Sequence, residues 1–242
     1  MTQPVDARSE PLIGQPPSRI RLAALIIAKA VVVGAFFTVW SVVYGLVNAH
    51  VSAPERTIHL MPPSAQFPGI IQPWTALVYV FGGFALPVLP FCFDRSWRTI
   101  LFALLSYGLG SVVSFACYWV WPISIERPEF DDPDPGSSLM RWLQTVDQPG
   151  NCCPSSHVLF AVLGALLVGR VGAGRIALAV TWLLAVAVCA TTITTGQHYF
   201  FDIAGGATTA LAAYLLTGRL IRDPPRAAAD LVARSGSCEV VT

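Results

Sequence analysis

The chain has 242 residues, of which 54% are hydrophobic and 12% are charged, and its formal net charge at pH 7 is +1. A soluble domain has about twice this share of charged residues, so the composition argues against a soluble globular protein. The small net charge gives no indication of a nucleic-acid partner, and none is expected.

Six windows hold almost no charge, and each is close to the roughly 20 residues that a membrane-spanning helix needs. In chain order they are residues 23–47, 74–93, 99–125, 154–169, 176–196 and 198–218, and the fourth is the shortest. A chain of this length cannot bury six such helices within a soluble core. We therefore predict an all-α, polytopic membrane bundle with six transmembrane helices.

The first apolar window follows Arg19 and Arg21, as the core of a secretory signal would. It exceeds the roughly 7–15 apolar residues of a signal peptide, so we expect it to be retained as an anchor helix. Residues 1–18 and 222–242 are rich in Pro, Ser, Ala and charged residues, which predicts two disordered cytoplasmic tails. The membrane domain is expected over residues 19–221, with its chemical motifs between residues 120 and 206.

The distribution of arginine predicts the orientation in the membrane. With the N-terminus inside, the inner segments hold eleven arginines and the outer segments hold three, Arg56, Arg127 and Arg141. This bias places both termini in the cytoplasm and the loops 48–73 and 126–153 outside. We expect an integral protein of a bacterial inner membrane whose polar helix ends near Gly196 and in loop 126–153 face outward.

The outer loop 126–153 contains Leu139, Trp142, Leu143 and Val146 at helical spacing. This pattern predicts a short amphipathic helix. Such a helix can lie on the bilayer surface or pack on its own protein, and the sequence favours neither arrangement.

Few ionisable groups lie near the predicted helix ends, and groups at such depth are candidates for function. His157 begins the fourth window, while His198 and Asp202 begin the sixth. Arg127 follows the end of the third window. The predicted topology brings these four side chains to one depth near the outer surface.

Each of these short patterns is ambiguous when taken alone. His198 and Asp202 are four residues apart, so on a helix the carboxylate can accept the imidazole Nδ1–H, or the two can form a purely structural pair. Ser155 and Ser156 follow Pro154 at a helix start, which suits an anion site or a simple serine cap. Arg127 suits a phosphate, or it can answer the acidic residues of its loop.

The order of these patterns is more specific. Arg127-Pro128, then Pro154-Ser155-x-His157, then His198-x-x-x-Asp202 resembles the motifs of the type-2 phosphatidic acid phosphatase and vanadium haloperoxidase superfamily, over about residues 99–218. The resemblance implies that His198 is the nucleophile, that Asp202 orients it and that His157 protonates the leaving oxygen. It also implies that Arg127, Ser155 and the backbone amides of Ser155 and Ser156 hold the phosphoryl oxygens.

Four residues depart from the family motifs. Val120 stands where the first motif has lysine, Thr191 and Thr192 stand where the third has Ser-Arg, and Ser156 replaces a glycine. A site with fewer cations suits a phosphodiester, which carries one negative charge, better than a phosphomonoester. The segment 191–206 and the proline-rich stretch 61–74 also resemble the inositolphosphorylceramide synthase-like branch, which implies transfer of a phosphate-bearing head group to an alcohol.

We therefore expect an inositolphosphotransferase-like membrane enzyme that forms a phosphohistidine intermediate on a lipid substrate, with a lipid or alcohol acceptor. The alternatives are a plain lipid phosphomonoesterase, acting on phosphatidate or an isoprenyl pyrophosphate, and a non-enzymatic transporter or scaffold. No cofactor is expected. Zinc binding by Cys152, Cys153, His157 and His198 is disfavoured because adjacent cysteines suit one tetrahedral ion poorly, so no metal site is expected.

Overall fold

The computed structural model describes residues 19–51, 58–60, 69–94 and 96–221. The two predicted tails, 1–18 and 222–242, Arg56 and most of the proline-rich stretch 61–74 lie outside the described residues. The described part contains the helices α1 (Arg19–Val51), α3 (Gly83–Phe93), α4 (Trp97–Val120), α5 (Pro135–Val146), α6 (Ser156–Arg170), α7 (Arg175–Thr194) and α8 (Phe200–Leu220), the helical turns η2 (Pro73–Thr75) and η3 (Val78–Gly82), and the strands β1 (Ile58–Leu60) and β2 (Ile123–Ile125).

The fold is all-helical apart from the two short strands, and five of its helical segments are long and apolar enough to cross a membrane. They are Leu22–Val51, Pro73–Phe93, Trp97–Val120, Arg175–Thr194 and Phe200–Leu220. The predicted fourth span corresponds to α6, which has 15 residues. A helix of that length is about 22 Å long, against about 30 Å for the hydrocarbon core, so the predicted count of six is not reached by length alone.

The third predicted window was too long. The helix α4 ends at Val120, and Ile123–Ile125 form β2, which pairs in parallel with β1. Pro122 explains the difference, since a proline disfavours helical geometry at the residue before it and cannot donate a helical hydrogen bond. Apolar composition alone does not reveal this end, because β2 is as apolar as the helix.

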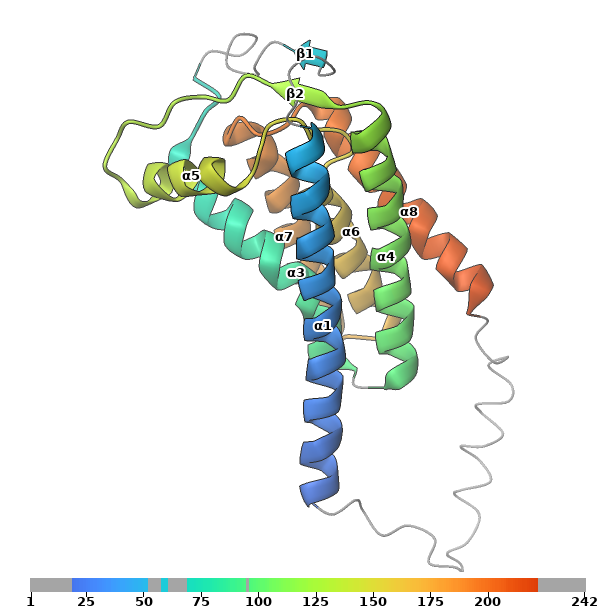
Figure 1. The fold of residues 1–242 in the computed structure, drawn as a ribbon. Helices are drawn as coiled ribbons and strands as arrows, with labels where there is room; N and C mark the ends of the chain where they lie inside the picture. The colour runs from blue at the N-terminus through green and yellow to red at the C-terminus, as the bar shows by residue number, and fades with distance from the viewer. Residues whose placement is uncertain (1–18, 52–57, 61–68, 95, 222–242) are drawn as a thin grey trace, which may run out of the picture.

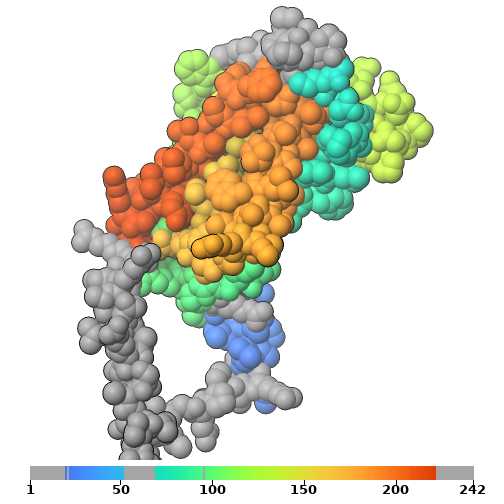
Figure 2. Space-filling view, turned by 180° about the vertical axis from the view of Figure 1, so that it is seen from behind, coloured from blue at the N-terminus to red at the C-terminus, as the bar shows by residue number. Residues whose placement is uncertain are grey.

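The short helix α6 occupies the centre of the bundle, where it packs against α3, α4, α7 and α8. Its residues Leu159, Leu163 and Leu167 are fully buried, as expected for a helix that is apolar on all sides. In Figure 2, α7 and α8 cover most of one face of the molecule. The helix α1 lies against α4 and extends beyond the bundle at its N-terminal end (Figure 1).

Close packing of α6 on α3 depends on Gly164. A Cβ atom added there would lie 2.5 Å from the backbone oxygen of Leu86 and 2.8 Å from its carbonyl carbon, which no side-chain rotation can relieve. Gly164→Ala should therefore destabilise the protein by about 1–3 kcal/mol. Gly45→Ala is the matched control, because a Cβ there would have no neighbour within 4 Å.

The measurement for this pair is thermal unfolding in one detergent, followed by circular dichroism. Gly164→Ala should lower the Tm by several degrees, whereas Gly45→Ala should leave it unchanged or raise it slightly. Equal Tm values for the two variants would show that α3 and α6 are not in the contact described.

One end of the bundle holds both strands, α5, the start of α6 and the start of α8 (Figure 1). The helix α5 packs on its own protein: Met140 is fully buried in a cluster with Ala76 and Phe130, which Leu139 and Leu143 extend. The remaining half of its apolar stripe, Trp142 and Val146, is exposed. The sequence left both arrangements open, and the structure shows packing on the protein with an exposed apolar edge.

Candidate active site

The start of α6 is built around Ser155. Its side chain accepts a hydrogen bond from the backbone N–H of Val158 at 3.4 Å, so it caps the helix as one sequence interpretation proposed. The same hydroxyl lies 3.1 Å from Nε2 of His198. The cap of α6 and the contact with His198 are therefore made by one buried oxygen.

His198 is buried and its ring is held at both nitrogens. Nδ1 lies 3.0 Å from the backbone oxygen of Cys152. A carbonyl oxygen can only accept, so the proton is on Nδ1 and the Nε2 lone pair faces the Ser155 hydroxyl. Asp202 Oδ2 lies 3.4 Å from the same Nδ1. The sequence suggested Asp202 as the orienting group, and the structure adds the nearer carbonyl of Cys152.

Asp202 also fixes the start of α8. Its Oδ2 accepts the backbone N–H of Tyr199 at 2.8 Å, and the side chain is fully buried. Gly205 and Gly206, one turn further on, allow α8 to approach the segment before α6. A Cβ at Gly206 would lie 2.6 Å from the backbone oxygen of Ser155, so this close approach requires a glycine.

His157 lies beside His198, with their ring centroids 6.3 Å apart and their planes tilted by 60°. Both imidazoles can therefore contact one small group. His157 also contacts Tyr79, whose hydroxyl is 2.9 Å from its Nδ1. No sequence pattern indicated Tyr79, because it lies 78 residues away in an apolar stretch.

Arg127 is bound to Asp147 in this structure. Its guanidinium donates to the Asp147 carboxylate at 3.0 Å, to the Asp147 backbone oxygen, and to the Gln148 backbone oxygen at 3.2 Å. Tyr44, Asn48 and Asn151 also donate to the other carboxylate oxygen. The carboxylate thus offsets much of the arginine charge, and Arg127 pairs with an acidic residue of its own loop, one of the two interpretations left open by the sequence.

Of the two backbone amides proposed as anion donors, that of Ser155 already has a partner in the structure. The N–H of Ser155 donates to the backbone oxygen of Asp202 at 3.2 Å. The hydroxyl of Ser156 is bound to Tyr118 at 2.8 Å, while Tyr118 donates to the oxygen of Pro154. The serine that replaces the family glycine therefore ties α6 to α4 through its side chain.

The two adjacent cysteines are free thiols. Burial raises the pKa of the Cys152 thiol well above its ordinary value, and the nearby charge of Asp202 acts in the same direction. Burial and Asp202 likewise raise the pKa of Cys153 to about 12. Both side chains stay protonated at neutral pH and pack as neutral groups around the His198–Asp202 pair.

Cys152, His198 and Asp202 each offer one possible metal ligand atom, all within 4.8 Å of one another. Zinc binds thiolate rather than thiol, and burial opposes loss of the Cys152 proton. His198 Nδ1 is also the nitrogen bound to the Cys152 carbonyl. The donor set therefore fits a metal ion poorly, and no chemical step is assigned to one.

The positions that depart from the family motifs supply no cation. The side chain of Val120 is 80% exposed at the end of α4. Thr191 and Thr192 are buried, and their hydroxyls donate to backbone oxygens of their own helix. Arg141, the other arginine of loop 126–153, binds backbone oxygens of Phe130 and Asp132 in its own loop.

The fold and this site define a class: a helical membrane protein with two histidines and an aspartate gathered at one end of the bundle. The chain belongs to the PAP2 superfamily, whose family model matches residues 69–216. Members of this superfamily are typically phosphatases or phosphotransferases. No curated protein and no solved structure gives a significant match to the chain.

Proposed function

We propose that this protein is an integral-membrane enzyme that cleaves or transfers the phosphate-bearing head group of a lipid through an intermediate on His198. The observation that supports this most strongly is the arrangement of the two imidazoles. His198 has its proton on Nδ1 and a lone pair on Nε2, and His157 lies next to it at 6.3 Å between centroids. This pairing suits a nucleophile and a proton donor that act on one phosphorus atom.

The proposed reaction has two steps. The Nε2 lone pair of His198 attacks phosphorus and forms a P–N bond, while the P–O bond to the leaving alcohol breaks. His157 gives its proton to that oxygen. In the second step an acceptor, water or an alcohol, loses a proton to His157 and attacks phosphorus, which releases His198. Ser155, freed from Nε2, can then donate to a phosphoryl oxygen.

The charge around the site supports a phosphodiester and hence an inositolphosphotransferase-like reaction. Arg127 is the one cation at the site among the described residues, and Asp147 offsets its charge. A phosphomonoester with nearly two negative charges would meet little opposing charge here. A diester with one negative charge matches the site better. This argument favours head-group transfer over plain phosphomonoester hydrolysis.

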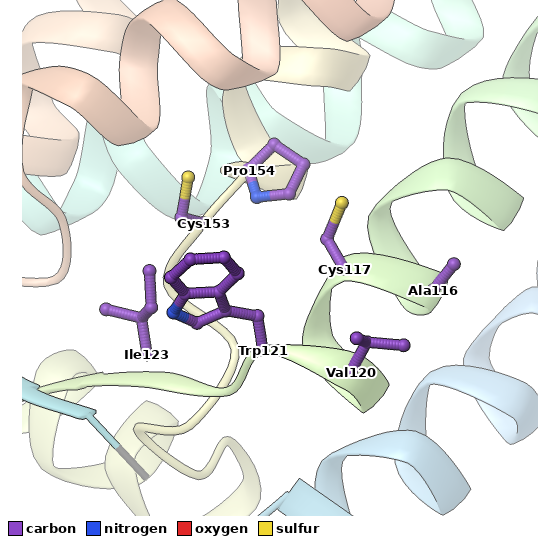
Figure 3. A pocket seen from close by; sticks show the side chains of 7 residues that line it. All are labelled: Ala116, Cys117, Val120, Trp121, Ile123, Cys153 and Pro154. Carbon is purple, nitrogen blue, oxygen red and sulfur yellow. The ribbon is translucent and has the colours of Figure 1, made fainter.

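The surroundings suit a lipid substrate. An apolar pocket of about 400 Å³ lies beside Pro154, between the segment before α6 and the end of α4 (Figure 3). Its lining residues are Ala116, Cys117, Val120, Trp121, Ile123, Cys153 and Pro154. The pocket can take an acyl chain whose head group is at Ser155. In the proposed arrangement α6 completes six spans, and the site faces the outer side of the membrane.

Product analysis tests this function. The purified protein, in detergent or nanodiscs, would receive a phospholipid labelled in its head-group phosphate together with an alcohol acceptor. The proposal predicts a labelled phosphodiester of the added alcohol. Free phosphate from a monoester, without transfer, would identify a lipid phosphomonoesterase. Solute flux in vesicles without any conversion of a panel of lipid phosphates would instead identify a transporter.

Asp147 should control the preference for substrate charge. Asp147→Asn keeps the shape of the side chain but removes the negative charge that opposes Arg127. We expect the ratio of phosphomonoester to phosphodiester turnover to rise several-fold, because the freed guanidinium favours the more highly charged substrate.

The measurement is kcat/KM for a monoester and a diester with the same lipid tail. Asp134→Asn is the matched control, since Asp134 caps α5 and lies outside the site. A substrate ratio that stays the same in both variants would contradict the proposed charge selection.

A further inference from the structure

The residue in closest contact with the His157 ring is Tyr79. The two rings stack with centroids 4.0 Å apart and planes 26° apart, and the hydroxyl lies 2.9 Å from Nδ1. Tyr79 is 1% exposed. A buried tyrosine hydroxyl needs a polar partner, and His157 is the partner it has within the described part of the chain.

Gly83, four residues after Tyr79, also lies beside the His157 ring. A Cβ there would lie 3.0 Å from Cδ2 of His157, so the ring occupies the space that a larger residue would take. Tyr79 lies in the π-helix Val78–Gly82, which Gly83 caps, and π-helices are a rare geometry that often occurs at functional sites. Tyr79 and Gly83 together form what we call the imidazole cradle.

We propose that Tyr79 is a positioning residue for His157 and that the imidazole cradle fixes which nitrogen exchanges protons. This inference rests on the proposed role of His157 as proton donor. When the Tyr79 oxygen accepts from Nδ1–H, one proton of the imidazolium stays on Nδ1 and the other leaves from Nε2. The neutral ring that remains has its lone pair on Nε2, ready to take the proton of the acceptor.

Proton donation matters most when the leaving alcohol is a poor leaving group. A positioning role for Tyr79 therefore predicts a loss that depends on the leaving group, whereas a packing role predicts an equal loss for all esters. The test compares dodecyl phosphate with p-nitrophenyl phosphate, or the matching methyl diesters if only diesters are turned over. Tyr79→Phe keeps the stacked ring and removes the hydroxyl. The first step is followed as single-turnover release of the alcohol, since His157 also acts in the second step. We expect this rate to fall about 10-fold for the dodecyl ester with little change in KM, and to change less than about 2-fold for the p-nitrophenyl ester.

Tyr107→Phe is the matched control. Tyr107 is also fully buried, and its hydroxyl donates to the Pro87 backbone oxygen at 3.1 Å, outside the site. It should affect both esters equally. Gly83→Ala is a second variant that displaces the ring without touching Tyr79, and it should show the same selective loss on the dodecyl ester.

The turnover of both esters is also measured for His157→Ala and His198→Ala. If Tyr79→Phe and Gly83→Ala slow both esters equally, or change neither, while His157→Ala is selective for the dodecyl ester, the inference about the cradle is wrong and the proposed function stands. If His198→Ala retains full turnover, the proposed function itself is wrong.

Discussion

Replacing His198 with alanine is expected to lower turnover of any lipid phosphate by about 10⁴-fold or more. The reason is that Nε2, the nitrogen left with the lone pair when Nδ1–H binds the Cys152 carbonyl, forms the bond to phosphorus. Without it the reaction loses its covalent route, and effects of this size are typical when a nucleophile is removed. The measurement is kcat/KM of the purified variant in the same detergent as the unchanged protein.

His50→Ala is the control for this experiment. His50 stacks on Trp119 with centroids 3.5 Å apart, so it is a histidine in an aromatic contact away from the site. His50→Ala should keep kcat/KM within about 2-fold of the unchanged protein, because His50 supplies no group to the reaction. Substantial turnover by His198→Ala, at a Tm equal to that of the control, would exclude His198 as the nucleophile.

Replacing His157 with alanine is expected to lower kcat for alkyl phosphoesters by about 10²–10⁴-fold. An alkoxide leaves poorly unless it receives a proton, and His157 is the titratable side chain that faces His198 at 6.3 Å. A p-nitrophenolate leaves without a proton, so the loss on that ester in the first step should be less than about 10-fold. A single-turnover measurement of p-nitrophenol release isolates this step.

An equal fall in the rate of the first step for both esters would assign His157 to substrate binding or packing. The pH dependence offers a second check, since a proton donor gives a basic limb in the profile of kcat/KM that disappears in His157→Ala. Persistence of that limb in the variant would assign the titration to another group.

Helix positions were the most predictable feature of the fold, since long apolar windows have few alternatives in a membrane. The errors came where the chain leaves the helix without becoming polar. The strand Ile123–Ile125 continues the apolar run of α4, so only Pro122 marks the boundary. The shortness of α6 was visible in the sequence, but its burial at the centre of the bundle follows from tertiary packing.

For the site, the sequence indicated the groups that recur in short motifs and missed the groups that support them. His157, His198, Ser155 and Asp202 lie together, as the order of motifs predicted. The Cys152 carbonyl was not foreseen, because a backbone group leaves no trace in residue type. Nor was Tyr79, whose contact with His157 spans 78 residues of sequence. An acidic partner for Arg127 was one of two open interpretations, and the structure identifies it as Asp147.

The structure also gives roles to three residues at the start of α6 that the motifs do not explain. Ser156, in place of a family glycine, binds Tyr118 and ties α6 to α4. Cys152 and Cys153 provide small neutral side chains beside a buried carboxylate, where a charged residue would disturb Asp202. Both roles are structural, and neither adds a reactive group.

The central claim is that His198 bonds to phosphorus during turnover. His157→Ala should accumulate that intermediate from a p-nitrophenyl phosphoester, because the leaving group needs no proton while the second step lacks its base. The reaction would be quenched at high pH, where phosphohistidine survives, and the peptides mapped by mass spectrometry. We predict a phosphorus adduct on His198 that is lost in the His157→Ala/His198→Ala double variant. An adduct on another residue, or turnover of the ester with no adduct at any time, would contradict this mechanism.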